Sequence, residues 1–158
     1  MLTYEHGSKK GVGSQLRVDI RKSNPMLSGC AILEIRNQTN DIDTARRGPK
    51  KWEFDDPNPA IAELSVTQVA HVLAVLRGFT PCILGGKGLS VKEEGRMALV
   101  HLDAITNAET HIIDWYDLHI KTIWANGEVA EGRIRLNPTE ASSLKDSLTG
   151  AMCAMAFG

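Results

Sequence analysis

The sequence contains few aromatic residues, few cysteines and no long apolar run, and its net charge is close to zero. Aromatic side chains make up 5% of the 158 residues, so any surface for ring stacking is small. The three cysteines, Cys30, Cys82 and Cys153, have neither C-x-x-C nor metal-ligand spacing, and their odd number argues against a disulfide framework. We therefore expect the cytoplasm or another reducing intracellular compartment.

Targeting segments and catalytic motifs are also missing. No 18-residue apolar run predicts a transmembrane helix, and the N-terminus lacks the apolar centre of a secretory signal. The glycine-rich stretches GSKKGVG and GGKG do not have the Walker A or dinucleotide spacing, and no serine lies in G-x-S-x-G. His111 and His119 would lie ~26 Å apart on one strand, too far to hold one metal ion. We expect a non-enzymatic protein without cofactor or metal.

The net charge of −1 hides an uneven distribution. Residues 1–51 carry ten lysines and arginines against five acidic residues, whereas residues 52–158 carry eight against fourteen. Such asymmetry is typical of a protein with one side facing a polyanion, although basic residues near a terminus can also simply keep an arm in solution. We expect residues 1–25 to form a flexible basic arm before a single domain at 26–158.

An internal repeat with an offset of 72 residues organises that domain. AIAELSVTQVAHVLAVL (60–76) corresponds to GRIRLNPTEASSLKDSL (132–148). Each copy begins with helix-capping chemistry, Ser65 followed by Gln68 in the first and Asn137 followed by Glu140 in the second. Apolar residues then recur at helical spacing, which predicts helices at 66–77 and 138–155.

Alternating stretches upstream of each helix predict antiparallel strands. These are 30–37 and 50–54 in the first half, and 95–105, 111–125 and the hairpin after Asn126-Gly127 in the second. The expected fold is α+β: two repeats, about 26–78 and 95–155, each an antiparallel sheet followed by a helix that packs on the sheets.

Alternation along residues 115–124 also predicts an open sheet face. Tyr116, Leu118, Ile120 and Trp124 would face the core and the residues between them would face outward. An outward face with cations and flat rings suits single-stranded nucleic acid, because cations neutralise phosphates and unpaired bases stack on rings. The arginines of this face could equally be ordinary solvent-exposed strand positions, and Trp52 could equally be a core residue. The residues chosen for this face and its basic neighbours are Arg36, Lys50, Lys51, Trp52, Trp115, His119, Lys121, Arg133 and Arg135.

Three stretches, SGCAIL (28–33), KKWEF…IAELSVTQVAHVL (50–73) and GRIRLNPTEASSLKDSL, make the chain similar to the Whirly single-stranded-DNA-binding proteins. That family shares its fold type with the positive-cofactor transcription coactivators and the kinetoplastid guide-RNA-binding proteins. The resemblance implies a tetramer formed through the helices, with DNA along the sheet edges. Ser28 and Cys30 replace two lysines of the family's strand motif, and Arg21 and Lys22 are candidates to compensate.

The end of the second predicted helix is too apolar for a free surface. Met152, Met155 and Phe157 are the predicted contacts of a homo-oligomer. The sequence thus favours a protein that binds single-stranded DNA with little sequence preference, in replication, recombination, repair or transcription. An RNA-binding or annealing protein on the same scaffold, and an oligomeric interaction module without nucleic acid, remain as alternatives.

Overall fold

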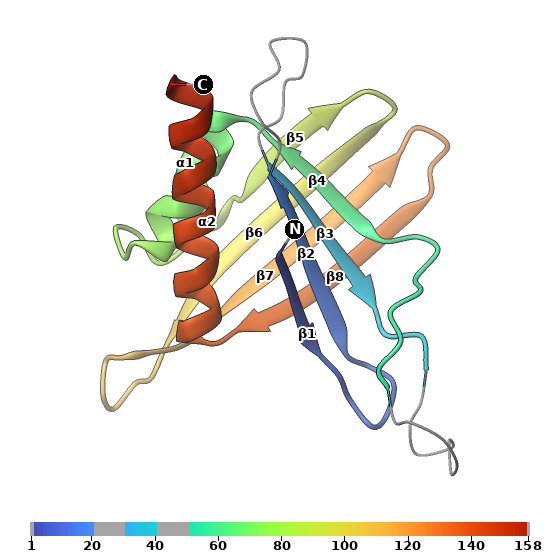
Figure 1. Cartoon of the computed structure of the whole chain (residues 1–158), viewed down its shortest axis with the longest axis horizontal. Coiled ribbons are helices and arrows are strands. Elements are labelled where there is room, and N and C mark those ends of the chain that lie inside the picture. The colour runs from blue at the N-terminus through green and yellow to red at the C-terminus, as the bar shows by residue number, and fades with distance from the viewer. Residues whose placement is uncertain (1, 21–30, 41–50, 158) are drawn as a thin grey trace.

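Two four-stranded antiparallel sheets, whose strands cross, and two helices beside them form the protein (Figure 1). The computed structural model describes residues 2–20, 31–40 and 51–157, with side chains as far as Ala154. The first sheet contains β1 (Leu2–His6), β2 (Ser14–Ile20), β3 (Ala31–Asn37) and β4 (Ala60–Leu64), and α1 (Val66–Leu76) follows it. After a 3-10 turn (Ile83–Gly86), the second sheet contains β5 (Leu89–Glu93), β6 (Arg96–Thr106), β7 (Ile113–Trp124) and β8 (Val129–Leu136), followed by α2 (Pro138–Phe157). Both sheets have sequential strand order, which confirms the predicted fold class.

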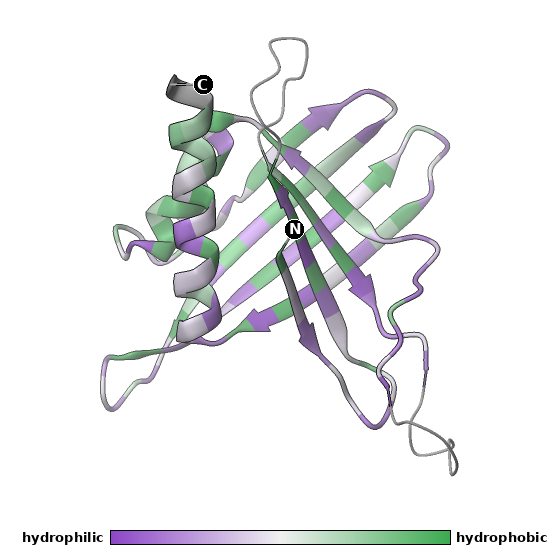
Figure 2. Cartoon of the chain, in the orientation of Figure 1, coloured by the Kyte–Doolittle hydropathy of each residue, from purple (hydrophilic) through white to green (hydrophobic). Residues whose placement is uncertain are grey.

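The two sheets pack against each other because each strand alternates apolar and polar residues, visible as bands along the strands in Figure 2. Leu33 and Ile35 on β3 and Leu118 and Ile120 on β7 are buried in one common core. The sheets approach each other closely at Gly132, where an added Cβ would lie 2.5 Å from Cγ2 of Ile35. Among the described residues, no helix has the length and apolarity needed to cross a bilayer.

Both helices begin with the predicted capping boxes. The Ser65 hydroxyl accepts from the backbone N–H of Gln68, and the Gln68 side chain accepts from the Ser65 N–H at 2.8 Å. The Asn137 side chain accepts from the Glu140 N–H at 2.8 Å, and Glu140 accepts in return at 3.0 Å. These reciprocal bonds satisfy backbone donors that a helix start otherwise leaves free. The sequence repeat is therefore also a structural repeat.

The two copies meet near their helix ends. Arg77 donates from Nη2 to Oγ1 of Thr149 at 3.0 Å, and these residues are 72 apart, the offset of the repeat. Gly78, at φ +79°, ends α1 as predicted, whereas α2 continues through Gly150. The two helices of the repeat are thus in contact at equivalent positions.

The prediction of a flexible arm at 1–25 is wrong over its described part, residues 2–20. Residue 1 and residues 21–25, with the predicted boundary at residue 26, lie outside the described residues. The described residues 2–20 form β1 and β2, with Leu16 and Val18 fully buried. The Tyr4 hydroxyl donates to Oγ of Ser143 on α2 at 3.0 Å, which ties β1 to the last helix. Gly11, at φ +77°, lies in the turn between these strands, a backbone conformation that favours glycine.

Two further expectations need correction in the strands. The predicted strand at 50–54 is wrong over its described part, because residues 51–59 contain no strand. The strand β5 was not predicted, since it is short and follows directly after three glycines that indicated only a break. Strands of five residues give too little alternation to stand out from a loop.

Candidate nucleic-acid interface

The outward surface of the second sheet, which we call the open face, is made by alternate residues of its four strands. The predicted alternation on β7 is confirmed: Tyr116, Leu118 and Ile120 are buried, while the residues between them are half-buried. Backbone pairing places the outward residues in cross-strand rows. The charged and aromatic members of the open face are Lys92, His101, Asp103, Trp115, Asp117, His119, Lys121, Glu131, Arg133 and Arg135.

Trp115 and Arg135 form a flat cationic platform at one end of the open face. The guanidinium carbon of Arg135 lies 4.8 Å from the centroid of the Trp115 ring. A cation over an indole is attracted to the ring, and a guanidinium in this position keeps N–H donors for a phosphate. The arrangement offers both a stacking surface and phosphate donors.

The middle of the open face holds paired and unpaired charges. His119 Nε2 lies 2.5 Å from Oε1 of Glu131, so this carboxylate is already engaged within the protein. The ring of His119 also stacks on His101 of the neighbouring strand, with 6.1 Å between centroids. Lys121 stands across from Glu131 in the register, and Arg133 stands across from His119. Among the described residues of the open face, Lys121, Arg133 and Arg135, together with Lys92 on β5, are thus the cations available to an external anion.

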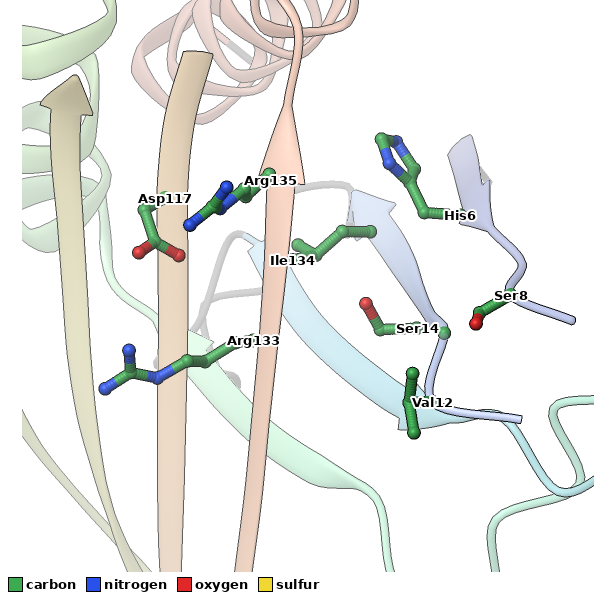
Figure 3. Close-up of a pocket in the computed structure, with 9 residues that line it drawn as sticks. His6, Ser8, Val12, Ser14, Asp117, Arg133, Ile134 and Arg135 are labelled. Atoms are coloured by element: carbon green, nitrogen blue, oxygen red, sulfur yellow. The ribbon is translucent and has the colours of Figure 1, made fainter. Parts of the chain in front are cut away.

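A hollow of about 370 Å³ lies where β8 passes the turn between β1 and β2. Figure 3 shows Arg133 and Arg135 on the same side of β8 as Asp117, with Ile134 on the opposite side. The opposite wall comes from the β1–β2 turn, through Ser8 and its neighbours. The hollow continues the open face around the free edge of β8.

The β1–β2 turn beside this hollow was not recognised as part of the site in the sequence. The buried Gln38 side chain fixes it: Oε1 accepts from the N–H of Ser8 at 2.8 Å and of Gly13 at 3.1 Å, and Nε2 donates to Ser8 O at 2.9 Å. The turn carries Lys9 and Lys10, both exposed. The long polar stretch between β1 and β2 was the available signal, but only strand pairing places it beside β8.

The remaining sequence-predicted residues lie on the first sheet or in the segment that leads into β4, away from the open face. Arg36 forms an ion pair with Glu34, its neighbour on the same side of β3. Trp52 is half-buried with its ring against Gly7, where an added Cβ would lie 2.1 Å from the indole. Lys51 lines a separate hollow of about 360 Å³ with Trp52. The structure therefore does not bring Arg36, Lys51 and Trp52 together with the β7–β8 residues.

Charge separates the two outward faces. On the first sheet, Arg17 and Arg36 are outnumbered by four acids, whereas on the open face four cations stand against three acids and two histidines. A polyanion is attracted to the face with the more positive potential. The open face of the second sheet is the better candidate.

Some predicted residues fall outside the described part of the chain. Arg21, Lys22 and Lys50 lie in residues 21–30 and 41–50, and the side chains of Met155 and Phe157 lie beyond the last described one. Met152 is half-buried and packs against the protein's own core. Its apolar character is thus partly explained within one chain.

The two crossed antiparallel sheets, each followed by a helix, define a Whirly-like fold. The structure is similar to that of WHY1 from Arabidopsis thaliana, with a TM-score of 0.55 and 14% identity over 98% of this chain and 86% of that chain. It is also similar to WHY3 from Arabidopsis thaliana, with a TM-score of 0.53 and 7% identity over 99% of this chain and 89% of that one. No protein-family model and no curated protein matches the sequence. At these identities the likeness concerns the fold.

Proposed function

We propose that this protein binds single-stranded DNA through the open face, with little overall sequence preference, and that its role is binding rather than catalysis. The observation that carries the proposal is the juxtaposition of Lys121, Arg133 and Arg135 with the Trp115 ring on one sheet surface. Cations release counterions from phosphates, and a base stacked on an aromatic ring contributes about 1–3 kcal/mol.

The shape of the surface favours a single strand over a duplex. Proteins that read duplex DNA commonly insert a helix into the major groove. Here α1 and α2 place their apolar sides in the core, through Val72, Leu73, Leu144 and Leu148. The open sheet face offers instead a broad surface on which exposed bases can lie.

Fluorescence polarisation with labelled oligo-dT at increasing salt concentration tests the proposal. On a single strand, each neutralised phosphate contributes roughly −0.7 to the slope of the logarithm of the association constant against the logarithm of the salt concentration. Neutralisation of three phosphates therefore predicts a slope of about −2. Absence of binding below ~10 μM at about 50 mM salt, or an affinity that salt does not change, would contradict the proposal. A matched RNA competitor in the same assay distinguishes a DNA-binding from an RNA-binding protein.

We also propose a homo-oligomer, a tetramer by analogy with the fold, that assembles through the end of α2. Support comes from the exposed Cys153 beside Met152 on the last turns of this helix. Cys153→Asp is expected to reduce the mass measured by size exclusion with light scattering, because a buried carboxylate opposes assembly. Thr139→Asp, on the exposed first turn of the same helix, should leave the mass unchanged. A wild-type mass equal to one chain would contradict the proposal.

A further inference from the structure

At the centre of the open face lies a hollow of about 290 Å³ whose lining differs from the surface around it. Its walls are His101 and Asp103 from β6, Asp117 and His119 from β7, and Arg133 from β8. A phosphate would meet two carboxylates here, so the hollow does not suit the backbone of the bound strand. Its lining calls for a ligand that donates hydrogen bonds on one side and accepts them on another.

The two carboxylates are held opposite each other. Asp103 and Asp117 are direct partners in the β6–β7 register, and both are half-buried. Like charges directly opposite on neighbouring strands destabilise a sheet. Within residues 2–20, 31–40 and 51–154, neither carboxylate has a hydrogen-bonding or ion-pair partner. Both are therefore acceptors available to N–H donors from outside.

The two histidines lie against each other on neighbouring strands of this lining. Their rings lie 28° from parallel, with 6.1 Å between centroids. His101 also lies against Gly88, where an added Cβ would lie 2.6 Å from Nε2. Gly88 has φ +74°, a conformation that favours glycine, so the backbone can approach the ring. The His101 ring therefore packs directly against backbone at this glycine.

We propose that this hollow is a guanine subsite within the single-strand path. Guanine carries N1–H and the N2 amino group as donors on one edge, and O6 and N7 as acceptors on another. The carboxylates of Asp103 and Asp117 take the donors, the guanidinium of Arg133 donates to the acceptors, and one imidazole of the His101–His119 pair stacks on the base. Adenine lacks the O6 acceptor, and thymine lacks the amino group, so neither satisfies both walls.

The inference rests on the proposed function, and the test separates the two. Wild-type protein is titrated with oligo-dT and with the same oligonucleotide carrying one central dG, dA, dC, deoxyinosine or 7-deaza-dG. We expect the dG strand to bind roughly tenfold tighter than oligo-dT. Deoxyinosine, without the amino group, and 7-deaza-dG, without N7, should each lose most of that gain.

Asp103→Asn and Asp117→Asn should abolish the dG preference while leaving oligo-dT affinity equal or higher, because each removes a negative charge from a face that binds phosphates. Asp114→Asn removes an exposed carboxylate from the same strand outside the hollow and should keep the preference. Equal binding of dG and dT strands by the wild type would overturn the subsite and leave single-strand binding intact. Binding of neither strand would remove the proposed function, and the subsite with it.

Discussion

Replacing Lys121, Arg133 and Arg135 together with alanine is expected to weaken oligo-dT binding by roughly a hundredfold at about 50 mM salt. Each charged contact with a phosphate contributes about 1 kcal/mol at a partly exposed site, and 1.4 kcal/mol corresponds to a factor of ten. The salt dependence should fall together with the affinity, from a slope near −2 toward zero, because fewer counterions are released. Polarisation titrations at several salt concentrations measure both quantities.

A triple variant with the same loss of charge elsewhere is the matched control. Arg17, Arg36 and Lys145 lie on the first sheet and on α2, outside the open face, and their replacement by alanine removes three positive charges as well. The control should bind oligo-dT within about threefold of the wild type, since long-range effects of exposed charges are largely screened. An equal loss in both variants would show that total charge, not the open face, determines binding.

The sequence was sufficient for both helix starts and for the two faces of β7 and β8. The capping pairs at Ser65 and Asn137 placed both helix starts, and strict alternation along β7 and β8 assigned each side chain to a face. Alternation with the apolar Ile134 and Leu136 predicted that Arg133 and Arg135 point outward. Both arginines are exposed, and Ile134 and Leu136 are buried. Capping residues and strand alternation act within one segment of the chain, so these features do not depend on the other sheet.

The parts that failed depend on contacts between distant segments. β1 and β2 were missed because the glycine-rich turn between them is held by the side chain of Gln38, some 30 residues away. Arg36 has the parity of a binding residue, but its pairing with Glu34 and the acids around it became visible only with the first sheet assembled. The hollow between His101 and Asp117 was missed for the same reason, since residues of β6, β7 and β8 meet there only through strand register.

Thr122→Val is expected to cause the largest loss of stability among the changes considered, about 2–5 kcal/mol. Thr122 is fully buried on β7, where its hydroxyl accepts from the N–H of Ile61 at 2.8 Å and donates to the carbonyl of Ile61 at 2.9 Å. Because β4 is the edge strand of the first sheet, these backbone groups of Ile61 face the second sheet instead of a neighbouring strand. Valine preserves the shape of the side chain and leaves two backbone groups without a partner.

Thr122→Ser is the control, because it retains the hydroxyl and should lose only about 1 kcal/mol for the missing methyl group. Thermal unfolding followed by circular dichroism compares the variants, and the valine variant should melt roughly 5–15 °C below the wild type. A valine variant as stable as the serine variant would contradict a role for this hydroxyl in joining the sheets.

Below its melting temperature, the valine variant should still bind oligo-dT within about twofold of the wild type. Thr122 belongs to the buried row of β7, whereas His119 and Lys121 belong to the outward row. The hydrogen bonds that join the two sheets and the residues of the open face therefore lie on opposite sides of one strand.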